Sequence, residues 1–400
     1  MRRGFASFVV SFTLIALPAV AQSPQPVTPE QALQRLLTSS PVQASWFDPA
    51  FLAQVPLTQL RQVVDQYTTQ WGKFQRIEAS AGSDRNYTVL MERASFPTKV
   101  VLNAQGQFAG LWFGVAEPLY ASFDDSIKPF SQLPGKVSLL VAEDGKPRAS
   151  LNPDEALAVG SAFKLAVLNA LNNEIVSGKR HWTDVVPLDP AWKTLPTGVI
   201  RTWPDETPMT LATYANEMIS ISDNTAADAL MAIAGRAQVE AVSPRNRPFL
   251  STKEAFILKD PANMVLLAKW RAADLAGKRA LLPEIDKLPL PSAAIFAGGP
   301  NSTDIEWLFT PGELCTLIDN VRALGAMQIN PGIADKKDWQ QIAFKGGSEP
   351  GVLNLTTALT GKTGHHYCVA ATWNNNAALD ENKFFSLYGG VLASLASETK

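Results

Sequence analysis

Ser161 and Lys164 are the residues of this sequence whose types and spacing best suit covalent chemistry. They stand three positions apart where an apolar helical stripe begins, so they share one face of the expected helix. An amine held against a hydroxyl in a poorly solvated site can lose its proton near neutral pH and act as its base. The alternative is a serine that caps the helix, followed by a solvated lysine.

Two further motifs follow along the chain. Ser222-Asp223-Asn224 lies between an apolar stretch and a helical pattern that ends at Gly235. Lys345 begins a Lys-Gly-Gly-Ser string at the end of a strand pattern. Glycines at a strand edge let a ligand lie against the backbone, and a lysine there offers a fixed cation to a carboxylate.

Composition excludes two other classes of protein. The 400 residues carry 35 Lys+Arg against 37 Asp+Glu, which gives no basic surface for nucleic acid. His181 stands alone and His365 and His366 are adjacent, so no helical His-x-x-x-His pair is present. We therefore expect neither a nucleic-acid partner nor a metal site.

The first 21 residues have the pattern of a secretory signal peptide. Arg2 and Arg3 precede an apolar run over residues 5–18, and Ala-Val-Ala ends at Ala21. We expect cleavage near Ala21 and a secreted or periplasmic protein, the alternative being a buried or amphipathic first helix. No later apolar stretch is long enough to predict a stable membrane span.

Export would permit a disulfide between the two cysteines. Cys315 stands in a helical pattern and Cys368 in a strand pattern. Both also fit the role of small buried hydrophobic residues, and the sequence does not decide between a bridge and two free thiols.

Residues 22–122 are expected to form a small α+β domain. Helical spacing up to about residue 69 is followed by four short strand patterns with turn residues between them. These are Phe74–Ala79, Tyr87–Arg93, Lys99–Asn103 and Gly110–Phe113. No chemical constellation accompanies them, so a packing, anchoring or partner-binding role is expected, with the partner unknown.

Residues 123–400 are expected to form a second α+β domain. Two strand patterns flank an Asp144-Gly145 hairpin signal, helical patterns fill about 160–335, and a last helix starts near Asp380. Strands return at Ile342–Lys345, Val352–Thr360 and Tyr367–Trp373. The N- and C-terminal segments should therefore complete one antiparallel sheet flanked by an all-helical part.

In this order, Ser-x-x-Lys, Ser-Asp-Asn and Lys-[Thr/Gly]-Gly resemble the motifs of penicillin-recognising serine hydrolases, particularly class A β-lactamases. The resemblance covers about residues 131–400. Residues 246–254 and 345–354 also look like a subgroup, of the clavulanate-cluster serine hydrolase type, that joins a cystatin- or isomerase-like domain to a class A-like domain. The resemblance implies that division at 22–122 and 123–400, and no cofactor.

The resemblance also implies roles for single residues. Ser161 would form an acyl-enzyme with a β-lactam or an ester that bears a carboxylate, while Lys164, with or without Ser222, accepts its proton. Lys345 would hold that carboxylate. The remaining residues expected to bind substrate are Asn224, Gly347 and Ser348, with the backbone N–H groups of Ser161 and Ser348 as the oxyanion hole.

Two departures from the family pattern bear on turnover more than on acylation. The Glu-x-x-Leu-Asn segment, whose glutamate activates the deacylating water, is absent. Glu254 is its nearest equivalent, the alternative being a solvated glutamate at the start of a helix. Gly346 stands where the family usually has threonine. A literal Lys-Thr-Gly at Lys362 lies between two strand patterns and reads as a hairpin turn, so Lys345 is the preferred cation.

Four functions remain in competition. The leading interpretation is an exported serine β-lactamase. The others are a slow esterase or accessory hydrolase of the same fold, a DD-peptidase-like penicillin-binding protein, and a binding module in which Ser161 is structural.

Overall fold

The computed structural model describes residues 27–80 and 83–398, which fall into two compact units. The first holds the described residues up to Glu92 together with Pro97–Gly114, and the second holds Arg93–Phe96 and the chain from Val115 onward. The predicted signal peptide lies outside the described residues. Within those residues, no helix has both the length and the apolar character needed to cross a bilayer.

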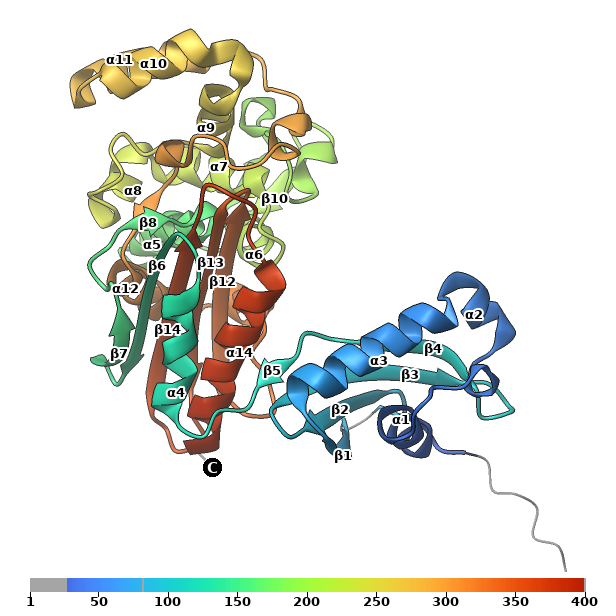
Figure 1. The fold of residues 1–400 in the computed structure, drawn as a ribbon. Helices are drawn as coiled ribbons and strands as arrows, with labels where there is room; N and C mark the ends of the chain where they lie inside the picture. The colour runs from blue at the N-terminus through green and yellow to red at the C-terminus, as the bar shows by residue number, and fades with distance from the viewer. Residues whose placement is uncertain (1–26, 81–82, 399–400) are drawn as a thin grey trace, which may run out of the picture. The chain divides into compact units, whose positions relative to one another are not determined.

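Helices precede an antiparallel sheet in the first unit, as predicted. They are α1 (Pro29–Thr38), η1 (Ala44–Trp46), α2 (Pro49–Gln54) and α3 (Leu57–Trp71). The strands β1 (Phe74–Ala79), β2 (Asn86–Met91), β3 (Ala94–Leu102) and β4 (Phe108–Phe113) pair in sequence order. Figure 1 shows α3 lying along one face of this sheet. The sequence did not indicate β5 (Glu117–Pro118), which pairs with the first residues of β3.

A five-stranded antiparallel sheet organises the second unit. Its strands are β6 (Lys136–Glu143), β7 (Lys146–Leu151), β12 (Gln341–Glu349), β13 (Val352–Thr360) and β14 (His366–Asn374), in the order β12-β13-β14-β6-β7. The two ends of the unit meet where Val141 of β6 pairs with Val369 of β14. Asp144 and Gly145 both have positive φ, 47° and 76°, as a tight hairpin requires.

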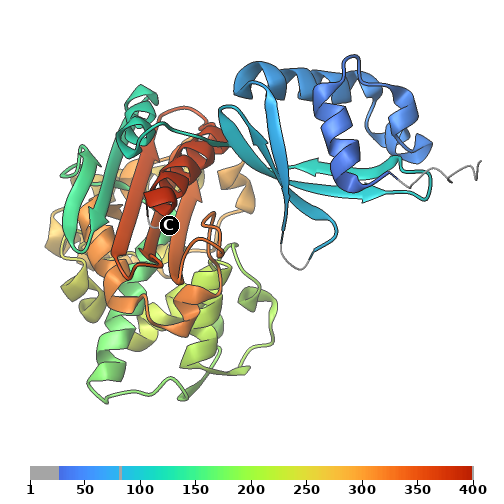
Figure 2. The ribbon, with the colours of Figure 1, turned by 90° about the horizontal axis from the view of Figure 1, so that it is seen from below.

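Helices cover both faces of this sheet (Figure 2). On one face, α4 (Phe123–Ile127) and α14 (Glu381–Glu398) pack on a buried cluster that includes Phe130, Phe384 and Tyr388. On the other lie α5 (Lys164–Val176) and α12 (Pro311–Val321). The predicted α+β class, with one sheet built from both ends and an inserted helical part, is confirmed.

The inserted part is a set of short helices joined by loops. They are α6 (Leu211–Ser220), α7 (Asn224–Ala234), α8 (Arg236–Val242), α9 (Thr252–Lys259), α10 (Met264–Ala272), α11 (Leu275–Ile285) and α13 (Gly325–Gln328). Two small two-stranded sheets accompany these helices. They pair β8 (Leu157–Ala158) with β11 (Leu308–Phe309) and β9 (Val185–Pro187) with β10 (Pro208–Thr210).

The two cysteines form a disulfide. Cys315 of α12 is bonded to Cys368 of β14, with a Cα–Cα distance of 5.8 Å. The bond fixes α12 against the sheet and decides the alternative that the sequence left open.

Candidate active site

Ser161 lies in the 3₁₀ turn η3 (Gly160–Phe163), which leads directly into α5. Lys164 is the first residue of α5 and is fully buried, at 0% exposure. Phe163 between them stacks on Trp307, with ring centroids 3.8 Å apart. This packing fixes the start of the helix, so the hydroxyl and the amine are held one turn apart as predicted.

The Lys164 amine is surrounded by oxygen atoms. Its Nζ lies 3.2 Å from Ser161 Oγ, 3.1 Å from Ser222 Oγ and 2.5 Å from the Ser222 carbonyl oxygen. It also lies 2.6 Å from Asn224 Oδ1. Burial, with the positive charge of Lys345, lowers the pKa of Lys164 well below its usual range. A neutral amine at this place can accept the proton of the Ser161 hydroxyl.

Ser222 lies between the two lysines. Its Oγ is 3.1 Å from the Nζ of Lys164 and 3.1 Å from that of Lys345. Its backbone has a φ of 61°, a left-handed conformation that a residue other than glycine adopts at a cost. This conformation lets the chain turn from α6 into α7 while the hydroxyl faces both amines.

Lys345 lies on β12 and is buried. Its amine donates to Ser222 Oγ and, at 2.5 Å, to the carbonyl oxygen of Gly346. Burial lowers the pKa of Lys345 to about 7. A bound carboxylate would favour the charged form, so this lysine is suited to bind an anion.

A loop over residues 195–200 holds the Ser-Asp-Asn turn in place. Asp223 Oδ2 accepts hydrogen bonds from the backbone N–H groups of Val199, at 2.6 Å, and Ile200, at 2.9 Å. Thr197 donates its hydroxyl proton to the carbonyl oxygen of Ser222. Gly198 has a φ of +99°, and a Cβ there would lie 2.0 Å from Asp223 Oδ2, so only glycine fits.

Both the oxygen and the nitrogen of the Asn224 side-chain amide have hydrogen-bond partners within the protein. Its Oδ1 accepts from Lys164, and its Nδ2 donates to the carbonyl oxygen of Leu195 at 3.2 Å. Its side chain therefore fixes the Lys164 amine, although it also lines the cavity beside Ser161.

Strand β12 lies very close to the turn that bears Ser161. A Cβ on Gly347 would lie 2.1 Å from the carbonyl oxygen of Val159 and 2.5 Å from the backbone nitrogen of Ser161. A Cβ on Gly160 would lie 3.0 Å from the backbone nitrogen of Ser348. The backbones that carry the two predicted oxyanion-hole N–H groups, those of Ser161 and Ser348, are thus close neighbours.

Gly346 has close neighbours on both sides. A Cβ at this position would lie 2.9 Å from Cζ of Phe344 and 3.2 Å from the carbonyl oxygen of Asn354. A larger residue here would therefore require the Phe344 ring to move.

Two cavities share Ser161, Thr197 and Ser348 in their walls. One, of about 360 Å³, contains the Ser222 and Lys345 side of the site. The other, of about 350 Å³, has four aromatic side chains in its wall, namely Phe163, Phe256, Phe296 and Trp307, and we call it the aromatic cavity. A substrate held at the Ser161 hydroxyl could therefore place an anionic group on one side and an apolar group on the other.

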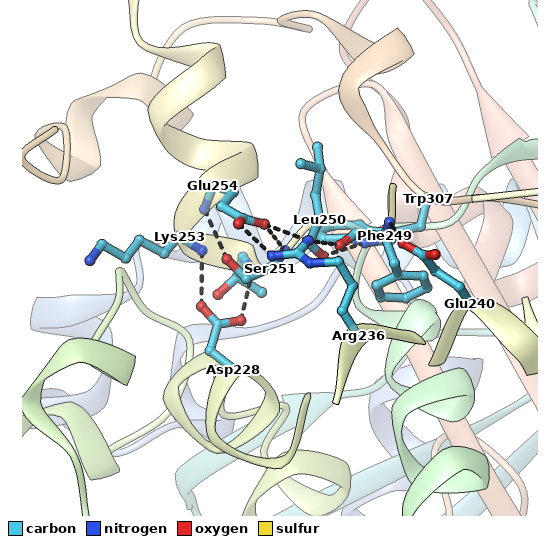
Figure 3. Close-up of polar contacts among 10 residues, drawn as sticks. Asp228, Arg236, Glu240, Phe249, Leu250, Ser251, Lys253, Glu254 and Trp307 are labelled. Atoms are coloured by element: carbon cyan, nitrogen blue, oxygen red, sulfur yellow. Dashed lines mark hydrogen bonds and ion pairs between the residues drawn. The ribbon is translucent and has the colours of Figure 1, made fainter. Parts of the chain in front are cut away.

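The structure does not bring Glu254 to Ser161. Glu254 is the third residue of α9, where it accepts from the backbone N–H of the N-cap Ser251. Both of its oxygens face Arg236, at 2.6 and 3.0 Å, as Figure 3 shows. Its side chain is buried rather than solvated and lines a different cavity, of about 330 Å³, together with Asp228.

Lys362 lies where the sequence predicted it, in the turn between β13 and β14. The turn closes with hydrogen bonds from Gly361 N–H to the carbonyl oxygen of His365 and from Gly364 N–H to that of Gly361. The Lys362 side chain is exposed.

Sequence reasoning missed a buried charged cluster, one member of which shares a cavity wall with Ser161. Lys259 contacts both Glu306 and Glu349, and Glu349 lines the aromatic cavity with Ser161. One signal was present, because Glu349 directly follows Ser348 in the third motif. Over residues 27–80 and 83–398, no group of three or more His, Cys, Asp or Glu side chains is arranged to hold a metal ion.

Comparison with known proteins gives a partial match. Residues 119–247, less than half of the chain, match the model of the Beta-lactamase enzyme family. That segment contains Ser161, Lys164, Ser222 and Asn224 and ends before Lys345. No curated protein matches the chain.

Solved structures of low identity are similar to the chain. A β-lactamase from Sphaerobacter thermophilus has 19% identity and a TM-score of 0.48, over 70% of this chain and 96% of its own. PBP-A has 14% identity and a TM-score of 0.48 over the same shares. The last common ancestor of Gram-negative bacteria class A β-lactamase has 14% identity and a TM-score of 0.49, over 70% of this chain and 100% of its own. Residues 119–247, which bear Ser161 and Lys164, are therefore similar to the β-lactamase enzyme family.

Proposed function

We propose that this protein is an exported serine hydrolase of the β-lactamase type, which opens β-lactam amides through an acyl-enzyme on Ser161. One observation carries the proposal. The hydroxyl of Ser161, the amine of Lys164, the hydroxyl of Ser222 and the amine of Lys345 form a continuous chain of contacts, each 3.1–3.2 Å long.

In the first step, Lys164 accepts the Ser161 proton as Oγ attacks the lactam carbonyl carbon. The C–N bond of the ring then breaks, and its nitrogen receives a proton through Ser222, which contacts Lys164 directly. The lowered pKa of Lys164 supports this role, because a protonated amine could not accept the serine proton.

Two further groups would bind the substrate. Lys345 would hold the carboxylate, and the backbone N–H groups of Ser161 and Ser348 would stabilise the oxyanion. Each such donor contributes roughly 10²–10³ in rate, which makes the close fit of β12 against η3 important for activity.

Further proposals concern the rest of the chain. Residues 1–21 would direct export, and 22–122 would form the cystatin- or isomerase-like domain of the subgroup, ahead of a class A-like domain over 123–400. The boundary between the two compact units, near residue 115, is compatible with this division.

The test is covalent labelling with a fluorescent penicillin, followed by mass spectrometry of the intact protein. We expect one adduct on the wild type and none on Ser161→Ala. Ser177→Ala is the matched control, since Ser177 is an exposed serine at the other end of α5 and its loss should leave labelling unchanged. Labelling that survives in Ser161→Ala would refute the proposal.

A second candidate is a penicillin-binding protein or slow esterase whose acyl-enzyme accumulates. The position of Glu254 favours it, because this carboxylate is bound to Arg236 and lines a cavity that does not contain Ser161. Steady-state hydrolysis of a chromogenic cephalosporin separates the two. A labelling burst without turnover supports the second candidate, and sustained turnover supports the first.

A further inference from the structure

Lys259, Glu306 and Glu349 form a buried charged cluster at the wall of the aromatic cavity. Lys259 is the last residue of α9, Glu306 precedes β11, and Glu349 is the last residue of β12. The Lys259 amine contacts Oε1 of Glu306 and Oε2 of Glu349. Three segments that are far apart in the sequence therefore meet at the ammonium group of Lys259.

The charges in this cluster do not balance without a proton. One lysine faces two glutamates, and an unpaired charge away from water is costly. Oε2 of Glu306 is buried and has no hydrogen-bond partner. Burial, with the negative charge of Glu349, raises the pKa of Glu306 well above its usual range. A protonated Glu306 beside Glu349 and Lys259 satisfies the cluster.

Only one member of the cluster reaches the cavity. The side chain of Glu306 is 0% exposed and that of Lys259 is 3% exposed, whereas Glu349 is 14% exposed and lines the cavity together with Ser161. Glu349 also directly follows Ser348, whose backbone lies against the nucleophile turn. A carboxylate is thus held, with one oxygen on Lys259, on the apolar side of the nucleophile.

We propose that Glu349 accepts the proton of the water that hydrolyses the Ser161 acyl-enzyme, with Lys259 and Glu306 as positioning residues that hold it. The proposal rests on the proposed function, since it needs an acyl-enzyme. It gives the deacylation step a base in a chain that lacks the Glu-x-x-Leu-Asn segment and whose Glu254 lines a cavity that does not contain Ser161.

The step balances without a further reactant. Water oxygen bonds to the acyl carbon while one water proton passes to Glu349. The tetrahedral intermediate collapses as the carbon–Oγ bond breaks, and Glu349 passes the water proton on to Ser161 Oγ. Glu349 and Ser161 thus return to their starting states, Lys164 stays neutral throughout, and the product leaves as the free acid.

The experiment measures acylation and deacylation separately. The wild type and Glu349→Gln are labelled with a fluorescent penicillin, excess label is removed, and loss of adduct is followed by mass spectrometry. We expect acylation within about threefold of the wild type and deacylation slowed by ~10²–10⁴, the usual contribution of a general base. Normal acylation also shows that the variant is folded.

A control variant removes a carboxylate from outside the site. Glu284→Gln removes an exposed glutamate from α11. It should deacylate at the wild-type rate. Glu349→Asp, which keeps the carboxylate on a shorter side chain, should deacylate faster than Glu349→Gln.

Positioning by Glu306 has its own readout. Glu306→Gln keeps the neutral form of this side chain but cannot ionise, so the change in deacylation rate that follows ionisation of Glu306 at high pH should disappear, while acylation stays unchanged. A purely structural role would lower both rates together and leave the pH profile in place.

The outcomes separate the two proposals. Wild-type deacylation in Glu349→Gln overturns the role of Glu349 and leaves the serine hydrolase standing. A wild-type acyl-enzyme that never deacylates also overturns it. A chain that no penicillin labels at Ser161 refutes the proposed function, and the role of Glu349 with it.

Discussion

Replacement of Gly347 by alanine tests the contact between β12 and the 3₁₀ turn η3, which bears Ser161. The added Cβ would lie 2.1 Å from the carbonyl oxygen of Val159, 2.5 Å from Ser161 N and 2.6 Å from Ala162 N. Ordinary contacts between such atoms are roughly 3.5 Å or longer. Since all three neighbours are backbone atoms, no side chain can rotate away, and the strand and the turn must separate by roughly 1 Å.

The displacement predicts two measurable losses. Overpacking of this kind costs about 1–3 kcal/mol of unfolding free energy. A misplacement of about 1 Å at reacting groups costs on the order of 10² in rate. We therefore expect the second-order rate constant for acylation by a fluorescent penicillin to fall about 100-fold in Gly347→Ala, measured by stopped flow, with a lower midpoint in urea.

Gly325→Ala is the control for this substitution. Gly325 begins α13, and a Cβ there would meet nothing within 4 Å. Its acylation rate should equal that of the wild type, and its stability should be unchanged or higher by about 0.4–1 kcal/mol. If Gly347→Ala acylates within threefold of the wild type and unfolds at the same urea concentration, the close packing of β12 on the turn is refuted.

Three further predictions concern charge and covalent structure. Because the pKa of Lys345 is about 7, the KM for an anionic β-lactam should rise above pH 7, whereas Lys345→Arg should flatten that rise, and equal pH profiles would contradict the assignment. Burial raises the pKa of Asp228 to about 7, so the folded state binds more protons than the unfolded state between about pH 4 and 7. The free energy of unfolding should therefore fall as the pH rises through that range. Urea melts of Asp228→Asn at several pH values should lack this fall, and a fall equal to that of the wild type would contradict the assignment. Reduction of the bond between Cys315 and Cys368, which are 53 residues apart, should lower the free energy of unfolding by about 4 kcal/mol by the chain-entropy model, and an unchanged melt in reductant would contradict it.

The sequence predicted the sheet of the second unit well, since long alternating strands carry a strong signal. β13 was predicted with its observed bounds, and the Asp144-Gly145 turn was placed correctly. The two-residue strands β5, β8 and β11 were missed. Pairs of two residues show no alternation, and only their tertiary partners define them as strands.

Within the site, local motifs predicted what lies close along the chain. The spacing of Ser161 and Lys164 on one helical turn was sufficient to bring their side chains together. The Ser-x-x-Lys pattern could not reveal that Asn224 would contact the Lys164 amine. Contacts of this kind depend on how the loops fold.

The ion pairs of Glu254 and Glu349 could not be predicted from local patterns. Glu254 had the expected place in the chain, but Arg236, eighteen residues earlier, donates hydrogen bonds to its carboxylate. Glu349 directly follows the third motif, but its partner Lys259 lies 90 residues away. A single sequence does not record pairs at such separations.

The disulfide has a consequence for proteolysis. The covalent ring that it closes between residues 315 and 368 contains α13, β12 and β13, and thus the strand with Lys345, Gly347 and Glu349. A protease that cuts the connection over residues 329–340 would leave two fragments still joined through sulfur. Such a nicked molecule would migrate as one band without reductant and as two with it. Strand β12 would lie in the C-terminal fragment, which the disulfide would still join to the N-terminal fragment.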